Sequence, residues 1–410
     1  MDLLKSKNSI LNINGISLKK LALKKTTPFY LYSADQIKKN VLDVKRALGA
    51  KNNLVCFAIK SNSNLNIIKE YKQYGIGADV VSLGELKLAL KAGVNAKKIV
   101  FSGVGKTSEE LSYAISKNIL LINCESQNEV ELINKIENKK KKVVNIGIRI
   151  NPDIKVKTNK KITTGEKQNK FGVSTSEFFK ILNIRNKYKN INICGLSFHI
   201  GSQIKDLLPY RKLLNSLDKI LIKLKKINFN LEYLDLGGGM AIPYFKNEKK
   251  FKINELGKLI KNFNKKNNLK LIFEIGRYLS GNIGLVISKV IYIKKIKDRY
   301  FIIIDAGMND MSRSAIYESY HEIISIEKRK GKFSKKIEFV GPICESSDTF
   351  GVYKNFSKLK EGDFVCITNS GAYGRSLSSN YNMRPLIEEI IIKNKKVQTI
   401  RKRQKIENIL

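Results

Sequence analysis

Short apolar runs recur along the first two thirds of the chain, and polar segments with helical periodicity separate most of them. The runs are rich in β-branched residues, which is typical of buried strands. Eight of them lie at residues 54–60, 76–82, 98–103, 119–124, 143–150, 193–199, 231–236 and 270–275. Alternating strands and helices predict a parallel sheet, and eight repeats predict a closed (β/α)8 barrel of the TIM type.

Start signals mark three of the intervening helices. A capping box has Ser or Thr followed three residues later by Glu, and its two side chains bond reciprocally to backbone N–H groups. Three such pairs open apolar-periodic segments: Thr107 with Glu110, Ser126 with Glu129, and Ser174 with Glu177. They predict helices that begin at these points.

The pattern changes after residue 280, where strand-like runs follow one another with turn residues between them. These runs lie at 284–296, 299–304, 336–340, 363–368 and 387–392. Residues 1–35 hold short apolar pieces that are too irregular for a helix and that predict further strands. We therefore expect three parts: N-terminal strands at 1–35 that pack with a β domain, the barrel at 36–280, and a C-terminal all-β domain at 281–410.

One long polar segment, residues 151–171, follows the fifth predicted strand without helical periodicity. Long loops of this kind are commonly functional, and the loops after barrel strands surround the active sites of such barrels. We expect an active-site loop here.

Composition excludes several classes of protein. No apolar run approaches the ~18 residues of a membrane span, and the first residues lack a signal peptide, which predicts a cytoplasmic protein without membrane association. The five cysteines are scattered and never in C-x-x-C spacing, so neither a disulfide framework nor a metal site is expected.

The formal net charge of +41 raises nucleic acid as a partner, because a basic field attracts polyanions. The excess of lysine is spread over the whole length, however, and no nucleic-acid-binding motif accompanies it. We expect no specific nucleic-acid partner, and only incidental binding that is sensitive to salt.

Candidate chemistry lies at the ends of the predicted barrel strands. The first run, from Val55, ends on Lys60, followed by Ser61 and Asn62. An amine held on rigid, apolar backbone can be desolvated, which lowers its pKa and prepares it for a Schiff base. The alternative is an ordinary surface lysine that ends a strand.

Other strand ends add polar groups to the same face, because the carboxyl ends of barrel strands converge there. The ends carry Asp79, then His199 with Ser202, then Gly237, Gly238 and Gly239, and finally Glu274 with Gly276 and Arg277. Consecutive glycines let backbone N–H groups approach a phosphate, although a tight turn is the alternative. A single histidine is as readily a core imidazole as a functional one.

Together these groups fit pyridoxal phosphate. Lys60 can form the Schiff base, while the glycines and Ser202 hold the phosphate. His199 can stack on the ring, and Glu274 can keep the ring nitrogen protonated, since a nearby carboxylate favours the pyridinium. A protonated ring is a strong electron sink, and loss of carbon dioxide is one way to use it.

Several motifs resemble those of the fold-type III pyridoxal-phosphate decarboxylases, which share the alanine racemase-like barrel, and the resemblance covers nearly the whole chain. Besides the segment 57–62, the motifs lie at 101–106, 149–153, 170–172, 199–203, 341–348 and 371–374. The resemblance is strongest to the members that convert meso-diaminopimelate to L-lysine and carbon dioxide, the last step of lysine biosynthesis by that route. It implies homodimers with shared active sites.

The resemblance also implies roles for individual residues. Lys60, Asp79, His199, Ser202, Gly276, Arg277 and Tyr373 are implied to contact the cofactor, and Lys60, His199 and Cys344 to act in catalysis. Arg277, Arg313, Tyr317, Glu345 and Tyr373 are implied to bind substrate: arginine can clasp the distal carboxylate and Glu345 can pair with the distal ammonium. Cys344 and Glu345 are implied to come from the second subunit. The alternatives are a buried, inert Cys344 and a Tyr373 that only packs between domains.

The chain departs from the family pattern at four positions, Ala241, Ile275, Ser314 and Asn159, and none of them removes a group that the chemistry requires. The nearest rival is a related decarboxylase of another basic amino acid such as ornithine or arginine. Arg277 and Arg313 argue against a substrate whose distal end is purely cationic. Glu274 argues against a racemase, which holds the ring nitrogen with arginine. A non-catalytic regulatory homologue is opposed by intact Lys60, Glu274 and Cys344.

Overall fold

A computed structural model describes residues 4–49, 53–138, 143–156, 159–162, 164–166, 168–245 and 247–410 of the chain. It has two compact units. One comprises Asn40–Ile242 and Lys249–Tyr278, and the other comprises the chain up to Lys39 with Pro243–Glu248 and Leu279–Leu410. We call them the barrel unit and the β unit.

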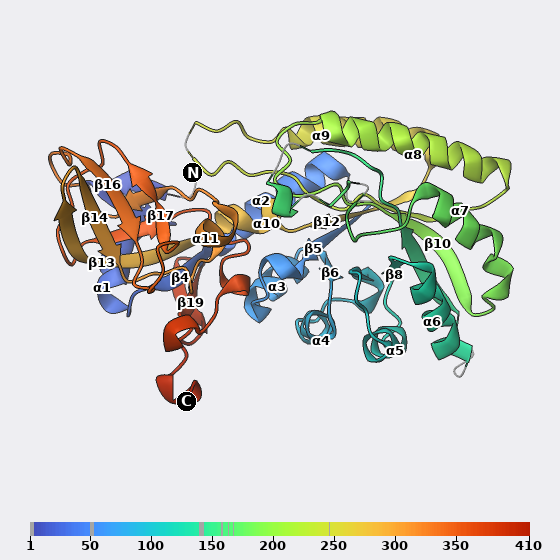
Figure 1. Ribbon diagram of the computed structural model, residues 1–410, viewed down its shortest axis with the longest axis horizontal. Coiled ribbons are helices and arrows are strands. Elements are labelled where there is room, and N and C mark those ends of the chain that lie inside the picture. Colours follow the sequence, from blue (N-terminus) through green and yellow to red (C-terminus); the bar gives the residue numbers. More distant parts are fainter. Residues whose placement is uncertain are drawn as a thin grey trace. The chain divides into compact units, whose positions relative to one another are not determined.

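The barrel unit contains eight parallel strands that close on themselves, which confirms the predicted barrel (Figure 1). The strands are β5 Leu54–Ala58, β6 Gly77–Val80, β7 Ile99–Phe101, β8 Leu121–Cys124, β9 Val144–Arg149, β10 Ile191–Ser197, β11 Tyr233–Asp235 and β12 Lys270–Ile275. Strand β12 pairs with β5 and closes the ring, with Glu274 opposite Cys56. The last strand thus lies beside the strand that leads to Lys60.

Helices follow the strands and cover the barrel from outside; α3 to α6 stand in a row in Figure 1. Their bounds are α2 Ala34–Leu48, α3 Leu65–Lys72, α4 Leu83–Lys91, α5 Ser108–Ser116, α6 Gln127–Asn138, α7 Thr175–Asn183, α8 Leu208–Lys226 and α9 Ile253–Asn267. In α8, buried leucines and isoleucines recur at helical spacing and face the barrel, which explains why this long lysine-rich segment is a helix.

Two of the three predicted capping boxes are confirmed, those of α5 and α7. The third differs. Ser126 Oγ accepts from the N–H of Glu129, but the Glu129 carboxylate accepts from Glu125 N at 2.9 Å and pairs with Lys106 Nζ at 2.6 Å. The buried Lys106 amine attracts the carboxylate that a capping box would turn back to Ser126.

The β unit takes in the N-terminal strands, as predicted. Strand β4 (Phe29–Ser33) lies in a nine-stranded sheet between β13 (Gly284–Ile296) and β19 (Glu388–Lys393). The other strands of that sheet are β14 Arg299–Ile304, β15 Ile323–Ser325, β16 Lys336–Val340, β17 Thr349–Tyr353, β18 Phe364–Ile367 and β20 Lys396–Arg401. A small sheet of β1 Leu4–Lys7, β2 Ile10–Ile13 and β3 Ile16–Ser17 precedes it.

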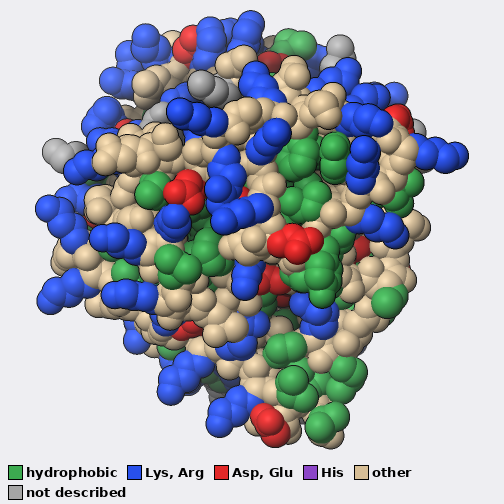
Figure 2. Space-filling view, turned by 90° about the vertical axis from the view of Figure 1, so that its left-hand side faces the viewer, with side chains coloured by type: hydrophobic (Ala, Val, Ile, Leu, Met, Phe, Trp, Pro, Cys, Tyr) green, Lys and Arg blue, Asp and Glu red, His purple; other side chains and the backbone are tan. Residues whose placement is uncertain are grey.

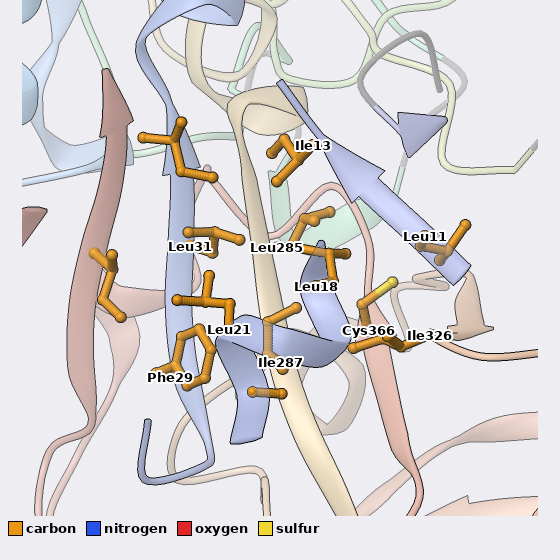
Figure 3. Close-up of a cluster of buried hydrophobic side chains, with 13 residues drawn as sticks. Leu11, Ile13, Leu18, Leu21, Phe29, Leu31, Leu285, Ile287, Ile326 and Cys366 are labelled. Carbon is orange, nitrogen blue, oxygen red and sulfur yellow. The ribbon is translucent and has the colours of Figure 1, made fainter. Parts of the chain in front are cut away.

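Figure 3 shows the core that joins these N-terminal elements to the C-terminal strands. Leu11 and Ile13 pack with Phe29, Leu285 and Ile287, all at most 7% exposed. Residues near both ends of the chain therefore build one core.

One prediction for residues 1–35 was wrong, since they contain a helix, α1 (Leu18–Lys24). Ser17 Oγ accepts from Lys20 N and so caps its first turn, and Leu18, Leu21 and Ala22 are its buried residues. Only two helical turns are present, too few for a periodic signal in the sequence.

Candidate active site

Lys60 lies just past the end of β5, on a single turn of 3-10 helix, Ile59–Ser61. Its Nζ is 3.1 Å from Oδ2 of Asp79, which lies near the end of β6 and is fully buried. The Lys60 side chain itself is 38% exposed. The amine is therefore held by a buried carboxylate and remains reachable from solvent.

Three buried carboxyl groups share the barrel interior: those of Asp79, Asp235 and Glu274. Burial and the charge of Asp235 raise the pKa of Glu274 to about 8. Burial also raises the pKa of Asp79 and of Asp235 to about 6 in each case. Asp79 Oδ1 has no hydrogen-bond partner among the described residues. This interior is short of positive charge.

His199 follows β10, and its Nδ1 accepts from Gly238 N at 3.3 Å. Burial, with the charges of Arg149 and Lys60, lowers the pKa of His199 well below its ordinary value. Both observations indicate a neutral imidazole with a bare Nδ1, which leaves the proton on Nε2.

Gly237, Gly238 and Gly239 pack closely against the backbone of neighbouring strand ends. Gly237 N–H donates to Asp235 Oδ1 at 2.9 Å and Gly238 N–H donates to His199, so two of the three N–H groups have partners within the barrel. A Cβ on Gly238 would collide with the carbonyl oxygen of Glu274, and one on Gly239 with that of Gly201. The glycines thus bring three strand ends together, and the N–H of Gly239 alone among them is left for a ligand within the described chain.

Arg277 begins the short helix α10 (Arg277–Ser280) after β12, and it is 5% exposed. Its Nε and Nη2 donate to Ser202 Oγ at 3.2 and 3.1 Å. The structure thus joins Ser202, predicted to bind the cofactor, with Arg277, predicted to bind both cofactor and substrate. A guanidinium beside a hydroxyl suits an anionic group.

A second buried ion pair anchors the loop after β9. Arg149 Nη1 donates to Glu125 Oε1 at 2.8 Å, and Gly172 N donates to Glu125 Oε2 at 2.7 Å. The Arg149 guanidinium also lies 4.6 Å from the centre of the Phe171 ring. Glu125 therefore fixes the far end of the predicted active-site loop, parts of which lie outside the described residues.

In the β unit, Arg313 lies in an aromatic enclosure. It begins helix α11 (Arg313–Tyr317), and its guanidinium is 5.5 Å from the Tyr244 ring and 6.0 Å from the rings of Tyr317 and Tyr373. Arg313 Nε donates to His321 Nε2 at 3.1 Å. The structure thus brings Arg313, Tyr317 and Tyr373 together around one guanidinium.

Cys344 and Glu345 lie on a turn of the β unit that a buried aspartate holds. Asp348 accepts from Met308 N and from Ile343 N, each at 2.7 Å. Cys344 is exposed, whereas the other four cysteines are buried. Tyr381 and Ser347 donate to the Glu345 carboxylate and lower its pKa. The turn presents a thiol and an anion to the surface.

Sequence reasoning missed some of these partners. Ser102, Asn123 and Asp235 join Glu274 inside the barrel, Glu125 holds Arg149, and His321 holds Arg313. One signal was available: a polar residue within or just after an otherwise apolar strand has to find a partner. Among the described residues, no group of three or more His, Cys, Asp and Glu could hold a metal ion.

The arrangement in the barrel unit fits pyridoxal phosphate. Lys60 offers an amine, the surplus of buried carboxyl groups suits a cationic ring nitrogen, and Arg277 with Ser202 suits a phosphate. In the described part of the chain no helix is long and apolar enough to cross a membrane.

Known proteins resemble this chain over most of its length. Residues 34–281 match the model of the pyridoxal binding domain of pyridoxal-dependent decarboxylases. A diaminopimelate decarboxylase of Aquifex aeolicus is 39% identical over 100% of this chain and 99% of its own. A crystal structure of diaminopimelate decarboxylase from M. jannaschii in complex with L-lysine is 36% identical and covers 100% of this chain and 96% of its own, with a TM-score of 0.95. The Helicobacter pylori enzyme complexed with L-lysine is 38% identical and covers 95% of this chain and 98% of its own, with a TM-score of 0.90.

Proposed function

The chain belongs to the pyridoxal-dependent decarboxylases, and on that premise we propose that it converts meso-diaminopimelate to L-lysine and carbon dioxide. The observation that carries the proposal is that Lys60 and Glu274 lie at the ends of two paired strands, β5 and β12, in a chain that matches named diaminopimelate decarboxylases over its whole length. Pyridoxal phosphate, when bound, supplies a sink for the electrons that stay behind when the carboxyl group leaves.

The barrel residues prepare the site for that chemistry. Glu274, in its ionised form, can hold a proton on the ring nitrogen, and its burial strengthens this interaction because little water screens it. Asp79 keeps the Lys60 amine at the mouth of the barrel. Arg277 and Ser202 offer donors to an anion, and neutral His199 presents a flat ring without a competing charge.

Substrate choice in this proposal rests on arginine. The distal end of meso-diaminopimelate carries a carboxylate and an ammonium, whereas that of ornithine carries only an ammonium. Arg313 is held by His321 and three aromatic rings, so its direction is fixed in advance. We assign Arg277 and Arg313 to the distal carboxylate, Glu345 to the distal ammonium, and Tyr317 and Tyr373 to the surrounding wall.

We further propose that the protein is a homodimer with shared sites, in which Cys344 and Glu345 complete the site built around Lys60 of the other subunit. The exposure of Cys344 supports this assignment, because a buried thiol could not serve a second chain. In the proposal Cys344 returns a proton to the substrate carbon after the carboxyl group has left.

The test is to incubate purified protein and pyridoxal phosphate separately with meso-diaminopimelate, L-ornithine, L-arginine and D-alanine, and to measure carbon dioxide and amino-acid products. We expect carbon dioxide and L-lysine with meso-diaminopimelate alone. A Lys60→Ala variant, prepared in parallel, controls for contaminating enzyme. Release of carbon dioxide mainly from ornithine or arginine would contradict the substrate, and L-alanine without carbon dioxide would contradict decarboxylation.

A further inference from the structure

A chain of buried polar side chains ends on Glu274. Ser102 Oγ donates to Glu274 Oε1 at 2.8 Å, and Asn123 Nδ2 lies 3.1 Å from Ser102 Oγ and 3.0 Å from Asp235 Oδ2. Asn123 Nδ2 is also 3.5 Å from Glu274 Oε1. All four residues are at most 7% exposed. Such a network of hydrogen-bonded polar side chains is costly to bury. None of Ser102, Asn123 and Asp235 has a role in the function proposed above.

The chain of side chains crosses the interior of the barrel. Ser102 follows β7 and Asn123 lies on β8, which are neighbours in the sheet. Asp235 and Glu274 lie on β11 and β12, which are also neighbours and are separated from the first pair by two strands on either side. Asn123 therefore connects opposite walls, and the contacts reflect the closed fold.

The backbone of Gly237 bonds to the Asp235 carboxylate and to the backbone of Glu274. Its N–H donates to Asp235 Oδ1 at 2.9 Å, and its carbonyl oxygen accepts from Glu274 N at 2.8 Å. Both oxygens of Asp235 thus have donors, from Gly237 and Asn123, which favours its ionised form. These two bonds oppose the burial that raises the pKa of Asp235 to about 6, so Asp235 loses its proton more readily than Glu274, whose pKa is raised to about 8.

Other charged and titratable groups surround this pair. Cys56 on β5, Lys60 just after it and Asp79 on β6 interact electrostatically with Asp235 or Glu274, and Arg149 on β9 and His199 after β10 interact in turn with Asp79 or Lys60. Two carboxyl groups in contact in a dry interior resist ionising together, so the pair tends to keep one proton. A cation bound next to Glu274 offsets the repulsion between the two carboxylates, so that both Asp235 and Glu274 can be ionised.

We propose that Asp235, Asn123 and Ser102 are positioning residues that direct the Glu274 carboxylate at the ring nitrogen of the cofactor and place a second negative charge behind it. The inference rests on the proposed use of pyridoxal phosphate. Two aligned carboxylates hold a proton on the ring nitrogen more firmly than one does, and they do so at higher pH. Asp235 acts through Glu274 and does not touch the cofactor.

The test follows the ring nitrogen itself by NMR, in protein loaded with pyridoxal phosphate that carries a heavy nitrogen isotope in the ring. The pH at which this nitrogen loses its proton is compared between the wild type and Asp235→Asn, which keeps the shape and loses the charge. We expect the midpoint to fall by at least about one pH unit, and cofactor affinity at neutral pH to fall by about tenfold, since one unit corresponds to a factor of ten. An unchanged midpoint in folded Asp235→Asn would overturn the proposal.

Asn123→Ser is the second variant, because it retains Asp235 and removes the bridge. We expect a smaller shift in the same direction, and the proposal fails if Asn123→Ser also titrates as the wild type does. The matched control is Glu129→Gln, a buried acid of the same barrel that is paired with Lys106 and lies outside this chain of contacts. Glu129→Gln is expected to lower the stability of the protein without changing the titration midpoint of the ring nitrogen. A shift as large as that of Asp235→Asn would also overturn the proposal.

These outcomes separate the inference from the function on which it rests. If the wild type fails to bind pyridoxal phosphate or to release carbon dioxide, the proposed function is wrong. If the wild type does both, and Asp235→Asn and Asn123→Ser share its midpoint, only the role of Asp235, Asn123 and Ser102 is wrong.

Discussion

At the scale of the residue, Lys60 is one lysine among many, and its surroundings distinguish it. Its amine is 3.1 Å from the buried Asp79 and is reachable at the barrel mouth. Lys106 also has a carboxylate partner, Glu129 at 2.6 Å, but the Lys106 side chain is only 1% exposed, whereas that of Lys60 is 38% exposed. A carboxylate partner alone therefore does not distinguish a reactive lysine. The exposure of the Lys60 side chain to solvent does.

Borohydride should fix pyridoxal phosphate covalently to Lys60, because it reduces a carbon–nitrogen double bond to a stable amine. Digestion and mass spectrometry identify the labelled peptide. We expect the label on Lys60 and none on Lys106, and no stoichiometric labelling of Lys60→Ala. A label on Lys106 or on any other lysine of the wild type would refute the assignment.

Glu274 predicts how the stability of the cofactor-free protein depends on pH. Its pKa is raised from 4.5 to about 8, so the folded protein binds this proton more tightly than the unfolded chain does. The resulting stability is fully present below the unfolded pKa and is lost as pH rises through the folded one. We expect the free energy of unfolding to fall between about pH 5 and pH 8, each pKa unit being equivalent to about 1.4 kcal/mol.

Glu274→Gln should flatten that decline, because glutamine does not titrate. Denaturant unfolding across the pH range measures it. Glu255→Gln is the control: it removes the same charge from an exposed position on α9 and should leave the decline in place. An equally steep decline in Glu274→Gln and in the wild type would show that Glu274 is ionised freely in the folded protein.

At the scale of the element, the packing of α9 on α2 depends on one glycine. A Cβ on Gly257 would collide with the carbonyl oxygen and carbon of Ala47, which are backbone atoms and cannot turn away. In an exposed helix Gly→Ala stabilises by about 1 kcal/mol. At Gly257 the clash outweighs this gain.

We expect Gly257→Ala to destabilise the protein by roughly 1 to 3 kcal/mol, the usual cost of overpacking, as measured by denaturant unfolding. Gly84 on α4 gives the matched comparison, because a Cβ there meets nothing nearer than 3.8 Å. Gly84→Ala should be neutral or stabilising. Equal effects of the two substitutions would mean that the helices do not pack this closely.

At the scale of the whole molecule, the proposed shared site can be tested by mixing two inactive variants. Lys60→Ala and Cys344→Ala, unfolded and refolded together, form heterodimers in which one site carries both lesions and the other carries none. With random exchange this restores about a quarter of wild-type activity. No recovery with heterodimers demonstrably present would mean that each site is built within one chain.

The reciprocal mixture is the control. Wild type refolded with the double variant Lys60→Ala, Cys344→Ala gives heterodimers in which both shared sites are damaged, so about a quarter of full activity remains. If each chain contains its own site, about half remains. Shared sites therefore give more activity than separate sites in the first mixture and less in the second.

The charge of the whole molecule predicts weak, unspecific attraction to nucleic acid. Figure 2 shows Lys and Arg scattered over the visible face among other side chains, without a single continuous stripe. Affinity for DNA should be independent of sequence and should fall steeply between low and physiological salt in a fluorescence-anisotropy titration. Tight binding of one sequence at high salt would contradict this expectation.

The sequence by itself determined the barrel, because eight apolar runs separated by helical segments have few other ways to bury their surface. It also placed Lys60, Asp79, His199 and Glu274 at strand ends, since the end of an apolar run is a local property. Three helix starts followed for the same reason, because a cap forms between residues three positions apart. The short helix α1 was missed because its stability comes from the core it joins.

Only the tertiary structure decided which strand ends meet. Ser102 and Glu274 are 172 residues apart and hydrogen-bonded, and no local pattern links them. Closure of the barrel also gave the N–H group of Gly238 to His199, 39 residues away, where the sequence suggested a phosphate. One physical reason explains both observations. The burial and the charges around a site come from strands that are distant in the sequence, and these strands surround the site only after the barrel has closed.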